Sequence, residues 1–298
     1  MVFRLADYDA HQRLTDPARP SAALWRLVLG VAVMAATYLA LLWLGSGAVV
    51  IVIGDRGRVL LQRMATGETP RGLIALLFVF GLLTAGLAVA LHFLHRRGLA
   101  GLIGPAPQAR RDFLRVALAV TLLSLVFLPV TLMAPNVGQQ RTLMQQLPYL
   151  PLALLGLLVQ TGTEELVFRG YLQSQLSARF HSPLIWVGLP AALFGLVHFD
   201  PVTYGANAWA VVVWATVFGA LAGDLTARSG SLGAAMGLHF AANFGAIFVV
   251  GTRGNLDGLA LYTMAVDLQD PAMMGPLLGL DLLGLGVMWL LARVMLRR

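Results

Sequence analysis

Long apolar stretches separated by short polar connections run through most of the 298-residue chain. Each stretch is about 20 residues long, the length that a helix needs to cross the hydrocarbon core of a bilayer. The pattern predicts eight spans, at residues 23–44, 72–94, 113–133, 147–168, 183–199, 208–227, 232–250 and 272–291. Residues 47–53 either extend the first span or form a separate interfacial segment. The predicted fold is all-α, a polytopic membrane helix bundle of about eight transmembrane helices.

The composition excludes several classes of protein. Hydrophobic residues make up 58% of the chain and charged residues only 12%, whereas a soluble domain has about 25% charged residues. The absence of cysteine excludes disulfides, thiolate metal sites and a cysteine nucleophile. The net charge of +7 comes from arginine alone, since the chain has no lysine. In a membrane protein this excess indicates topology and contact with anionic lipid, and we expect no nucleic-acid partner.

Arginine positions predict how the bundle is oriented. Residues 1–20 are polar and lack a signal-peptide pattern, so we expect a short cytosolic leader before a single transmembrane bundle at 21–298. Most arginines fall on the side of the termini: Arg4, Arg13, Arg19, Arg96, Arg97, Arg110, Arg111, Arg115, Arg179, Arg228, Arg293, Arg297 and Arg298. Four arginines of one loop, Arg56, Arg58, Arg63 and Arg71, fall on the opposite side and disagree. The majority predicts cytoplasmic termini, and the Arg-, Ala- and Gly-rich composition suggests a bacterial inner membrane.

Two adjacent carboxylates and an arginine follow the apolar part of the fourth span. Glu165 and Arg169 are four residues apart, so on a helix they share a face and can pair. Glu164 is rotated by about 100° from its neighbour and points elsewhere. Ionisable groups at membrane depth are costly unless they face a protein interior or a wet cavity. A structural ion pair explains Glu165 and Arg169, but it leaves Glu164 without a role.

Three further polar residues lie in later spans. Glu164 and His198 are each 17 residues from His181, in the turn between the fourth and fifth spans. Antiparallel helices that meet at this turn bring both residues to one level, about 25 Å away. His239 and Asn243 are four apart in the seventh span and share a helix face, among small residues that permit close packing. Hydrogen bonds between helices are the structural alternative for each of these residues.

Together, Glu164, Glu165, His198, His239 and Asn243 provide what hydrolysis requires. A carboxylate or an imidazole can take a proton from water, and Asn and His can donate to a developing oxyanion. Alternatively, two histidines and a glutamate suit a catalytic zinc with one position open for water. The HExxH arrangement is absent, so the zinc ligands would come from three separate helices.

The chain resembles the CAAX-protease and bacteriocin-processing (CPBP) intramembrane proteases, which include the type II CAAX prenyl endopeptidases. The family pattern is Glu-Glu-x-x-x-Arg, then Phe-x-x-x-His, then His-x-x-x-Asn or Asp. Here these boxes are Glu164-Glu165-x-x-x-Arg169, Phe194-x-x-x-His198 and His239-x-x-x-Asn243. They lie in order inside predicted spans, and the family-like protease core covers about residues 147–250. Outside this core the predicted spans show only hydrophobicity.

The resemblance implies roles for these residues. Glu164 and His198 would activate water, His239 and Asn243 would hold the oxyanion, and Glu165 and Arg169 would support the site. The family has been described both as metalloproteases and as metal-independent glutamate proteases, so Glu164, His198 and His239 are the ligands if zinc is bound. The sequence favours no obligatory metal, since Asn243 is a good oxyanion donor and a poor zinc ligand. The implied function is intramembrane hydrolysis of a peptide bond in a membrane-associated or prenylated peptide or protein.

Two other functions use the same residues differently. A non-enzymatic scaffold or immunity protein of the same family would need Glu164 and His198 only for packing. A proton-coupled carrier would use buried Glu, Arg and His as a relay, but the chain shows no internal symmetry of the kind that carriers often have. The protease hypothesis is therefore preferred.

Overall fold

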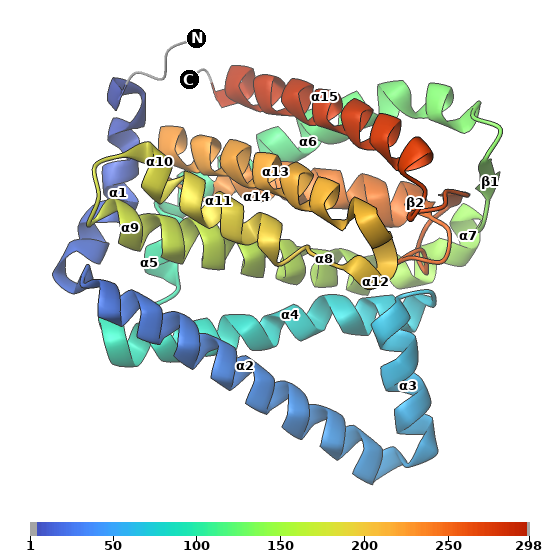
Figure 1. Cartoon of the computed structure of the whole chain (residues 1–298), viewed down its shortest axis with the longest axis horizontal. Helices are drawn as coiled ribbons and strands as arrows, with labels where there is room; N and C mark the ends of the chain where they lie inside the picture. Colours follow the sequence, from blue (N-terminus) through green and yellow to red (C-terminus); the bar gives the residue numbers. More distant parts are fainter. Residues whose placement is uncertain (1–4, 297–298) are drawn as a thin grey trace.

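The computed structural model describes residues 5–296, which form a bundle of long helices with a small sheet at one end (Figure 1). Arg4, Arg297 and Arg298 lie outside the described residues. The first half contains η1 (Leu5–His11), α1 (Gln12–Thr15), η2 (Asp16–Ser21), α2 (Leu24–Ile53), α3 (Asp55–Thr66), α4 (Pro70–Ala90), η3 (Leu91–His95), α5 (Ala100–Ile103), α6 (Ala106–Leu132), β1 (Val137–Gln139), α7 (Leu143–Gln146) and η4 (Leu147–Tyr149). The second half contains α8 (Leu150–Glu165), η5 (Leu166–Gln173), α9 (Ser174–Ser177), α10 (Pro183–Trp186), α11 (Gly188–Leu196), α12 (Pro201–Tyr204), η6 (Gly205–Asn207), α13 (Ala208–Ser229), α14 (Gly233–Phe244), η7 (Gly245–Val249), β2 (Val250–Thr252), β3 (Tyr262–Met264) and α15 (Pro271–Leu296).

The predicted helical membrane bundle is confirmed, although a count of eight full-length spans is not. Six helical segments of the described chain are long and apolar enough to cross a membrane: Leu24–Ile53, Pro70–His95, Ala106–Leu132, Leu143–Ser177, Pro201–Ser229 and Pro271–Leu296. The fifth and seventh predicted spans form shorter apolar helices, Pro183–Leu196 and Gly233–Val249. The Gly233–Val249 segment contains α14, which packs against α6, α8 and α13. Because neighbouring helices cover it, it does not need to match the bilayer thickness by itself.

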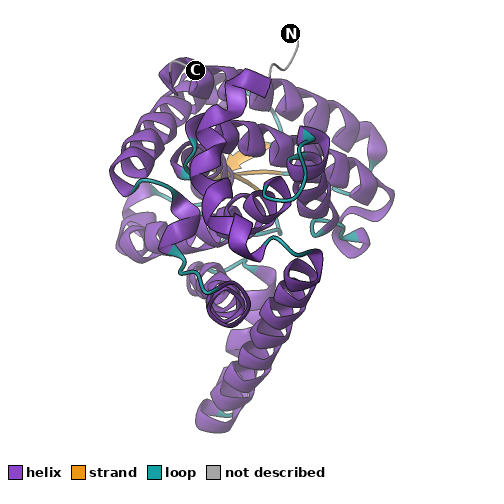
Figure 2. Ribbon diagram, turned by 90° about the vertical axis from the view of Figure 1, so that its left-hand side faces the viewer, coloured by secondary structure: helices purple, strands orange, loops and turns teal. Residues whose placement is uncertain are grey.

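The first span continues without a break to Ile53, so residues 47–53 extend it. Its buried side chains are confined to the first part of α2, at Leu27, Gly30 and Met34. Beyond that point α2 leaves the bundle, and α3 connects its far end back to α4 (Figures 1 and 2). The second part of α2 therefore presents apolar side chains on its surface, as expected of a helix in contact with lipid.

The described part of the expected leader, residues 5–21, packs on the bundle as short helices. Tyr8 donates a hydrogen bond to Asp224 of α13 at 2.8 Å, and Trp289 of α15 donates to the other carboxylate oxygen at 2.9 Å. Asp224 also accepts from Arg228 at 2.8 Å, four residues later on the same helix. One buried carboxylate thus connects the N-terminal segment with both α13 and the C-terminal helix α15.

Small residues bring α14 close to α6. A Cβ atom at Gly233 would overlap the backbone of Ala109, and one at Gly237 would overlap that of Phe113. Larger residues at these two positions would push α14 away from the bundle. The glycines therefore set the position of the helix that carries His239 and Asn243.

Three short strands, which the hydrophobic pattern does not reveal, lie at the end of the bundle opposite η1. Their order is β1-β3-β2, with β1 antiparallel and β2 parallel to β3. The register pairs Gly138 and Gly251 with Thr263. The sheet joins the loop before α7 to the loop before α15 and closes this end of the bundle.

Candidate active site

The first box lies within one continuous helical segment, Leu143–Ser177, of 35 residues. At 1.5 Å per residue this segment is about 50 Å long, more than the 30 Å of a bilayer core. The α-helical part ends at Glu165, and a π-helical segment begins at Leu166. Such wide turns are rare and are found frequently at functional sites. Glu164 and Glu165 lie just before this transition, and Arg169 lies just after it.

Glu165 is fully buried and holds two partners on one oxygen, an arginine and a histidine. Its Oε1 accepts a hydrogen bond from Arg169 Nη1 at 2.9 Å and lies 2.8 Å from His239 Nδ1. A carboxylate paired with arginine is an acceptor, so His239 Nδ1 carries a hydrogen. Arg169 also donates to the carbonyl of Gly219 at 3.2 Å. The predicted Glu165–Arg169 pair is therefore present, and it orients His239.

An aromatic cluster surrounds the arginine. The guanidinium carbon of Arg169 lies 4.6 Å from the ring centroid of Phe194, 5.8 Å from that of Phe218 and 6.0 Å from that of Phe168. Aromatic faces attract such a cation, and more strongly when water is excluded. The phenylalanine of the second box thus covers the charged residue of the first.

Glu164 differs from its neighbour in exposure and in partners. Its side chain is 12% exposed, whereas that of Glu165 is 0% exposed. Glu164 Oε2 lies 3.4 Å from His239 Nε2 and makes no hydrogen bond within residues 5–296. The two glutamates therefore face different nitrogens of one imidazole, and of the two only Glu164 is partly exposed.

His198 is held in a defined tautomer by its own helix turn. Its Nδ1 lies 2.7 Å from the carbonyl oxygen of Phe194. A carbonyl only accepts hydrogen bonds, so Nδ1 carries the hydrogen, and the neutral ring offers the Nε2 lone pair. The ring of Phe194 contacts the imidazoles of both His198 and His239, at centroid distances of 4.7 and 6.0 Å. Phe194 of the second box therefore contacts both histidines.

The helices on either side of His181 pack against one another, whereas the equal level of Glu164 and His198 stays a prediction. Phe168 and Phe194, which are equally far from His181 along the chain, pack edge to face with ring centroids 5.0 Å apart. The turn at residues 181–182 therefore brings the first and second boxes side by side.

Asn243 has a partner that sequence reasoning missed. Its Nδ2 donates to Gln160 Oε1 at 3.0 Å. Gln160 lies one helical turn before Glu164, and that spacing was the available signal. The amide group of Asn243 has a second N–H that this bond does not use. The carbonyl of Gly219 and the ring of Phe218 were also missed, because they come from α13, which has no box.

The fit to a zinc ion can be judged from the ligand positions. Within the described chain, no three His, Asp or Glu side chains lie close enough together to hold a metal ion. Glu164 and His239 approach one another, but His198 does not complete a ligand group with them. The arrangement of Glu164, His198 and His239 thus does not fit a zinc site, and we derive no step through a metal.

A comparison with known protein families matches the part of the chain that contains these residues. Residues 146–245 match the family model described as type II CAAX prenyl endopeptidase Rce1-like. This part of the chain is therefore similar to an Rce1-like domain. The domain contains all three boxes, and the predicted resemblance to the CPBP family is confirmed.

A relative that matches 61% of the chain gives less information. The uncharacterized protein YyaK of Bacillus subtilis (strain 168) is 28% identical over 206 residues, which cover 61% of this chain and 68% of that protein. No solved structure matches the chain significantly. The Rce1-like family and the apolar helices together indicate an integral membrane protein with a CAAX-type protease domain.

Proposed function

We propose that the protein is an intramembrane endopeptidase that hydrolyses a peptide bond of a membrane-associated or prenylated substrate. The observation that carries this proposal is the convergence of the first and third boxes on one imidazole. His239 faces Glu165 through Nδ1 and Glu164 through Nε2. A purely structural ion pair needs Glu165 and Arg169 but not a second, partly exposed carboxylate.

In this mechanism Glu164 and His198 activate the water. The oxygen of the water attacks the carbonyl carbon of the substrate, and its proton passes to the Glu164 carboxylate or to His198 Nε2. The proton then moves to the leaving nitrogen as the C–N bond breaks. Glu164 is suited to this role because its side chain is 12% exposed, whereas that of Glu165 is fully buried in the pair with Arg169.

The oxyanion of the tetrahedral intermediate is bound by His239 and Asn243. Glu165 holds the imidazole of His239 in place, because its oxygen lies 2.8 Å from Nδ1. A protonated imidazole can donate from Nε2 to an oxyanion, and the unused N–H of Asn243 is the second donor. Arg169 holds Glu165 in place through its hydrogen bond at 2.9 Å, which is a supporting role.

The test is hydrolysis of a panel of membrane peptides, prenylated and unprenylated, by the full chain in vesicles. Glu164→Gln should lower turnover by about 10² to 10⁴, the usual contribution of a general base, and leave the fold unchanged. Glu68→Gln is the matched control, because Glu68 is exposed and is the one glutamate of the chain besides Glu164 and Glu165. Turnover by Glu164→Gln at the wild-type rate would contradict the mechanism. A folded wild type that cleaves nothing in the panel would favour the scaffold alternative.

A further inference from the structure

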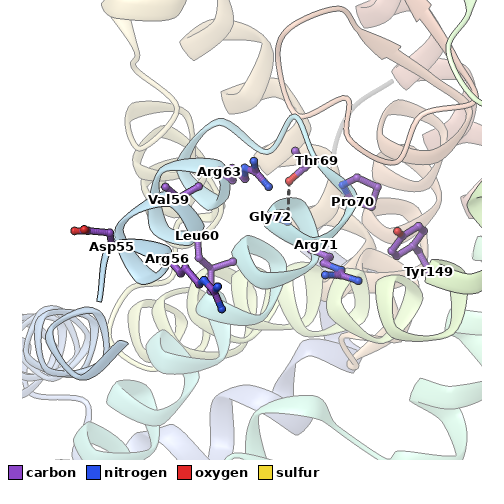
Figure 3. A pocket seen from close by; sticks show the side chains of 10 residues that line it. All are labelled: Asp55, Arg56, Val59, Leu60, Arg63, Thr69, Pro70, Arg71, Gly72 and Tyr149. Carbon is purple, nitrogen blue, oxygen red and sulfur yellow. Dashed lines mark hydrogen bonds between the residues drawn. The ribbon is translucent and has the colours of Figure 1, made fainter. Parts of the chain in front are cut away.

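Three arginines line a cavity that the proposed hydrolysis does not use. The cavity has a volume of about 720 Å³ and lies between α3, the start of α4 and the start of α8 (Figure 3). Arg56 and Arg63 reach it from α3, Arg71 from α4, and Tyr149 closes it beside α8. These arginines belong to the loop whose charge contradicts the orientation count. The preference of arginine for the cytoplasmic side therefore does not explain why these arginines lie here.

One face of α3 is built toward this cavity. Arg56, Val59, Leu60 and Arg63 follow the spacing i, i+3, i+4 and i+7, so they share a side of the helix, and all four line the cavity. The face has a positive charge at each end and aliphatic carbon between them. An amphipathic helix of this kind typically lies in the interface between water and lipid.

The charge of the cavity is not neutralised by the protein. Among residues 5–296, Arg56, Arg63 and Arg71 make no ion pair. Asp55 also lines the cavity, but its carboxylate accepts from Arg58 Nη1 at 2.9 Å. Three guanidinium groups around one space, in which the one lining acid is already paired with Arg58, attract an anion.

The cavity lies at the membrane boundary. The transmembrane helix α2 ends at Ile53, and α4 begins at Pro70, where Thr69 caps the helix by accepting from the Gly72 N–H at 3.2 Å. Two glycines with positive φ, Gly54 and Gly67, turn the chain before and after α3. Residues without a side-chain Cβ adopt this conformation at little cost. The turns place α3 across the ends of the two membrane helices.

The part of α2 that leads toward the cavity presents apolar side chains on its surface. The two helices α2 and α4 meet where Gly86 packs against the backbone of Met34, and further along α2 the side chains of Leu39, Trp43 and Ile51 are 60%, 75% and 85% exposed. Both views show α2 leaving the bundle toward α3 (Figures 1 and 2). Exposed apolar side chains thus follow α2 toward the end at which the arginines lie.

We propose that this cavity binds the phosphate-bearing headgroup of an anionic membrane lipid. The arginines hold the phosphate, Tyr149 lies at headgroup level as interfacial aromatics do, and the acyl chains lie along the exposed apolar side chains of α2. A free phosphate ion would satisfy the arginines but would leave the aliphatic face of α3 and the apolar surface of α2 uncovered. The site is independent of the hydrolytic mechanism.

The experiment is native mass spectrometry of the delipidated full chain in detergent. Phosphatidylglycerol, phosphatidylcholine and inorganic phosphate are added separately. We expect the wild type to bind phosphatidylglycerol about tenfold or more tightly than phosphatidylcholine, because each arginine near an anionic surface strengthens binding. The combined variant Arg56→Gln, Arg63→Gln and Arg71→Gln should lose this preference.

The matched control removes the same charge at the other end of the bundle, in Arg110→Gln, Arg115→Gln and Arg179→Gln, all of which are exposed. This control should retain the wild-type preference. Equal binding of both lipids by the wild type, or equal losses in both triple variants, would overturn the proposal. Binding of inorganic phosphate as tight as that of phosphatidylglycerol would show a free-anion site instead. Arg71→Gln alone, at the exposed first turn of α4, gives a partial loss and tests the site if the triple variant does not fold.

Discussion

The Nε2 atom of His239 lies 3.4 Å from Oε2 of Glu164. This approach joins a residue of α14 to one of α8, although the two are far apart in the sequence. The opposite ring nitrogen is held at 2.8 Å by Glu165, whose oxygen is also bound to Arg169. The imidazole is thus fixed from its buried side, while its other side faces the partly exposed carboxylate. Replacement of Glu164 and replacement of Glu165 should therefore have different effects on the protein.

Glu165→Gln should destabilise the protein, whereas Glu164→Gln should not. The Glu165 side chain is 0% exposed, and its loss leaves Arg169, 2% exposed, as an uncompensated buried charge. Removal of one partner of such a pair costs about 3–5 kcal/mol. Thermal unfolding in detergent should therefore show a clear decrease of the midpoint for Glu165→Gln. Equal midpoints for Glu165→Gln and Glu68→Gln would contradict the supporting role of Glu165.

Asn243→Leu should lower kcat with a smaller change in KM. Leucine has nearly the shape of asparagine but no N–H to donate to an oxyanion. Removal of one such donor typically costs about 10² to 10³ in kcat. The measurement is steady-state hydrolysis of the best substrate in the panel. A wild-type kcat in Asn243→Leu would remove Asn243 from the mechanism.

Gln160→Leu separates positioning from donation. It removes the acceptor at 3.0 Å that orients the Asn243 amide but keeps both N–H groups of Asn243. We expect a smaller loss of kcat than in Asn243→Leu, because the donor is still present but less well oriented. If the two folded variants lose equal activity, Asn243 acts only through its bond to Gln160.

A chelator should leave hydrolysis unchanged. The described His, Asp and Glu side chains form no group of three that could hold a metal ion, and Asn243 is a poor zinc ligand. Elemental analysis of the purified protein beside assays with and without chelator checks this. Stoichiometric zinc that is lost together with activity would instead make Glu164, His198 and His239 its ligands after a rearrangement.

Sequence patterns predict the local parts of this molecule well. Hydropathy identifies the apolar helices because each needs many consecutive apolar residues, and the spacing of Glu165 and Arg169 predicts their pair because it depends on one helix only. The equal level of Glu164 and His198, obtained by counting residues from a single turn, also depends on local geometry and stays a prediction. All three predictions use short-range geometry.

Contacts between distant segments were not predictable in this way. The acceptor for Arg169 is the backbone of Gly219, which no side-chain pattern marks. The contact of Tyr8 with Asp224 depends on packing of the N-terminal segment, which polarity alone suggests to be a free leader. The cavity arginines were visible only as an exception to the orientation count, and the fold shows why they lie together.

Acidification should loosen the N-terminal segment through His11. This imidazole stacks on Trp186 with ring centroids 4.9 Å apart, and neither ring nitrogen has a hydrogen-bond partner among the described residues. Burial lowers the pKa of His11 from 6.5 to about 4. Between these two pH values the detached segment binds more protons than the packed one, so stability is full above pH 6.5 and falls as the pH decreases toward 4. The total loss is about 3 kcal/mol, at 1.36 kcal/mol for each unit of pKa shift.

Hydrogen exchange of residues 5–21, corrected for the intrinsic rate at each pH, measures this opening. Protection should be lower at pH 5 than at pH 7.5 in the wild type. His11→Phe keeps a ring on Trp186 but cannot be protonated, so its protection should not change over this range. His181→Gln replaces an exposed histidine and should behave like the wild type. The titrating groups other than His11 are the same in the wild type and in His11→Phe, so pH sensitivity of wild-type size in His11→Phe would show that His11 is not its source.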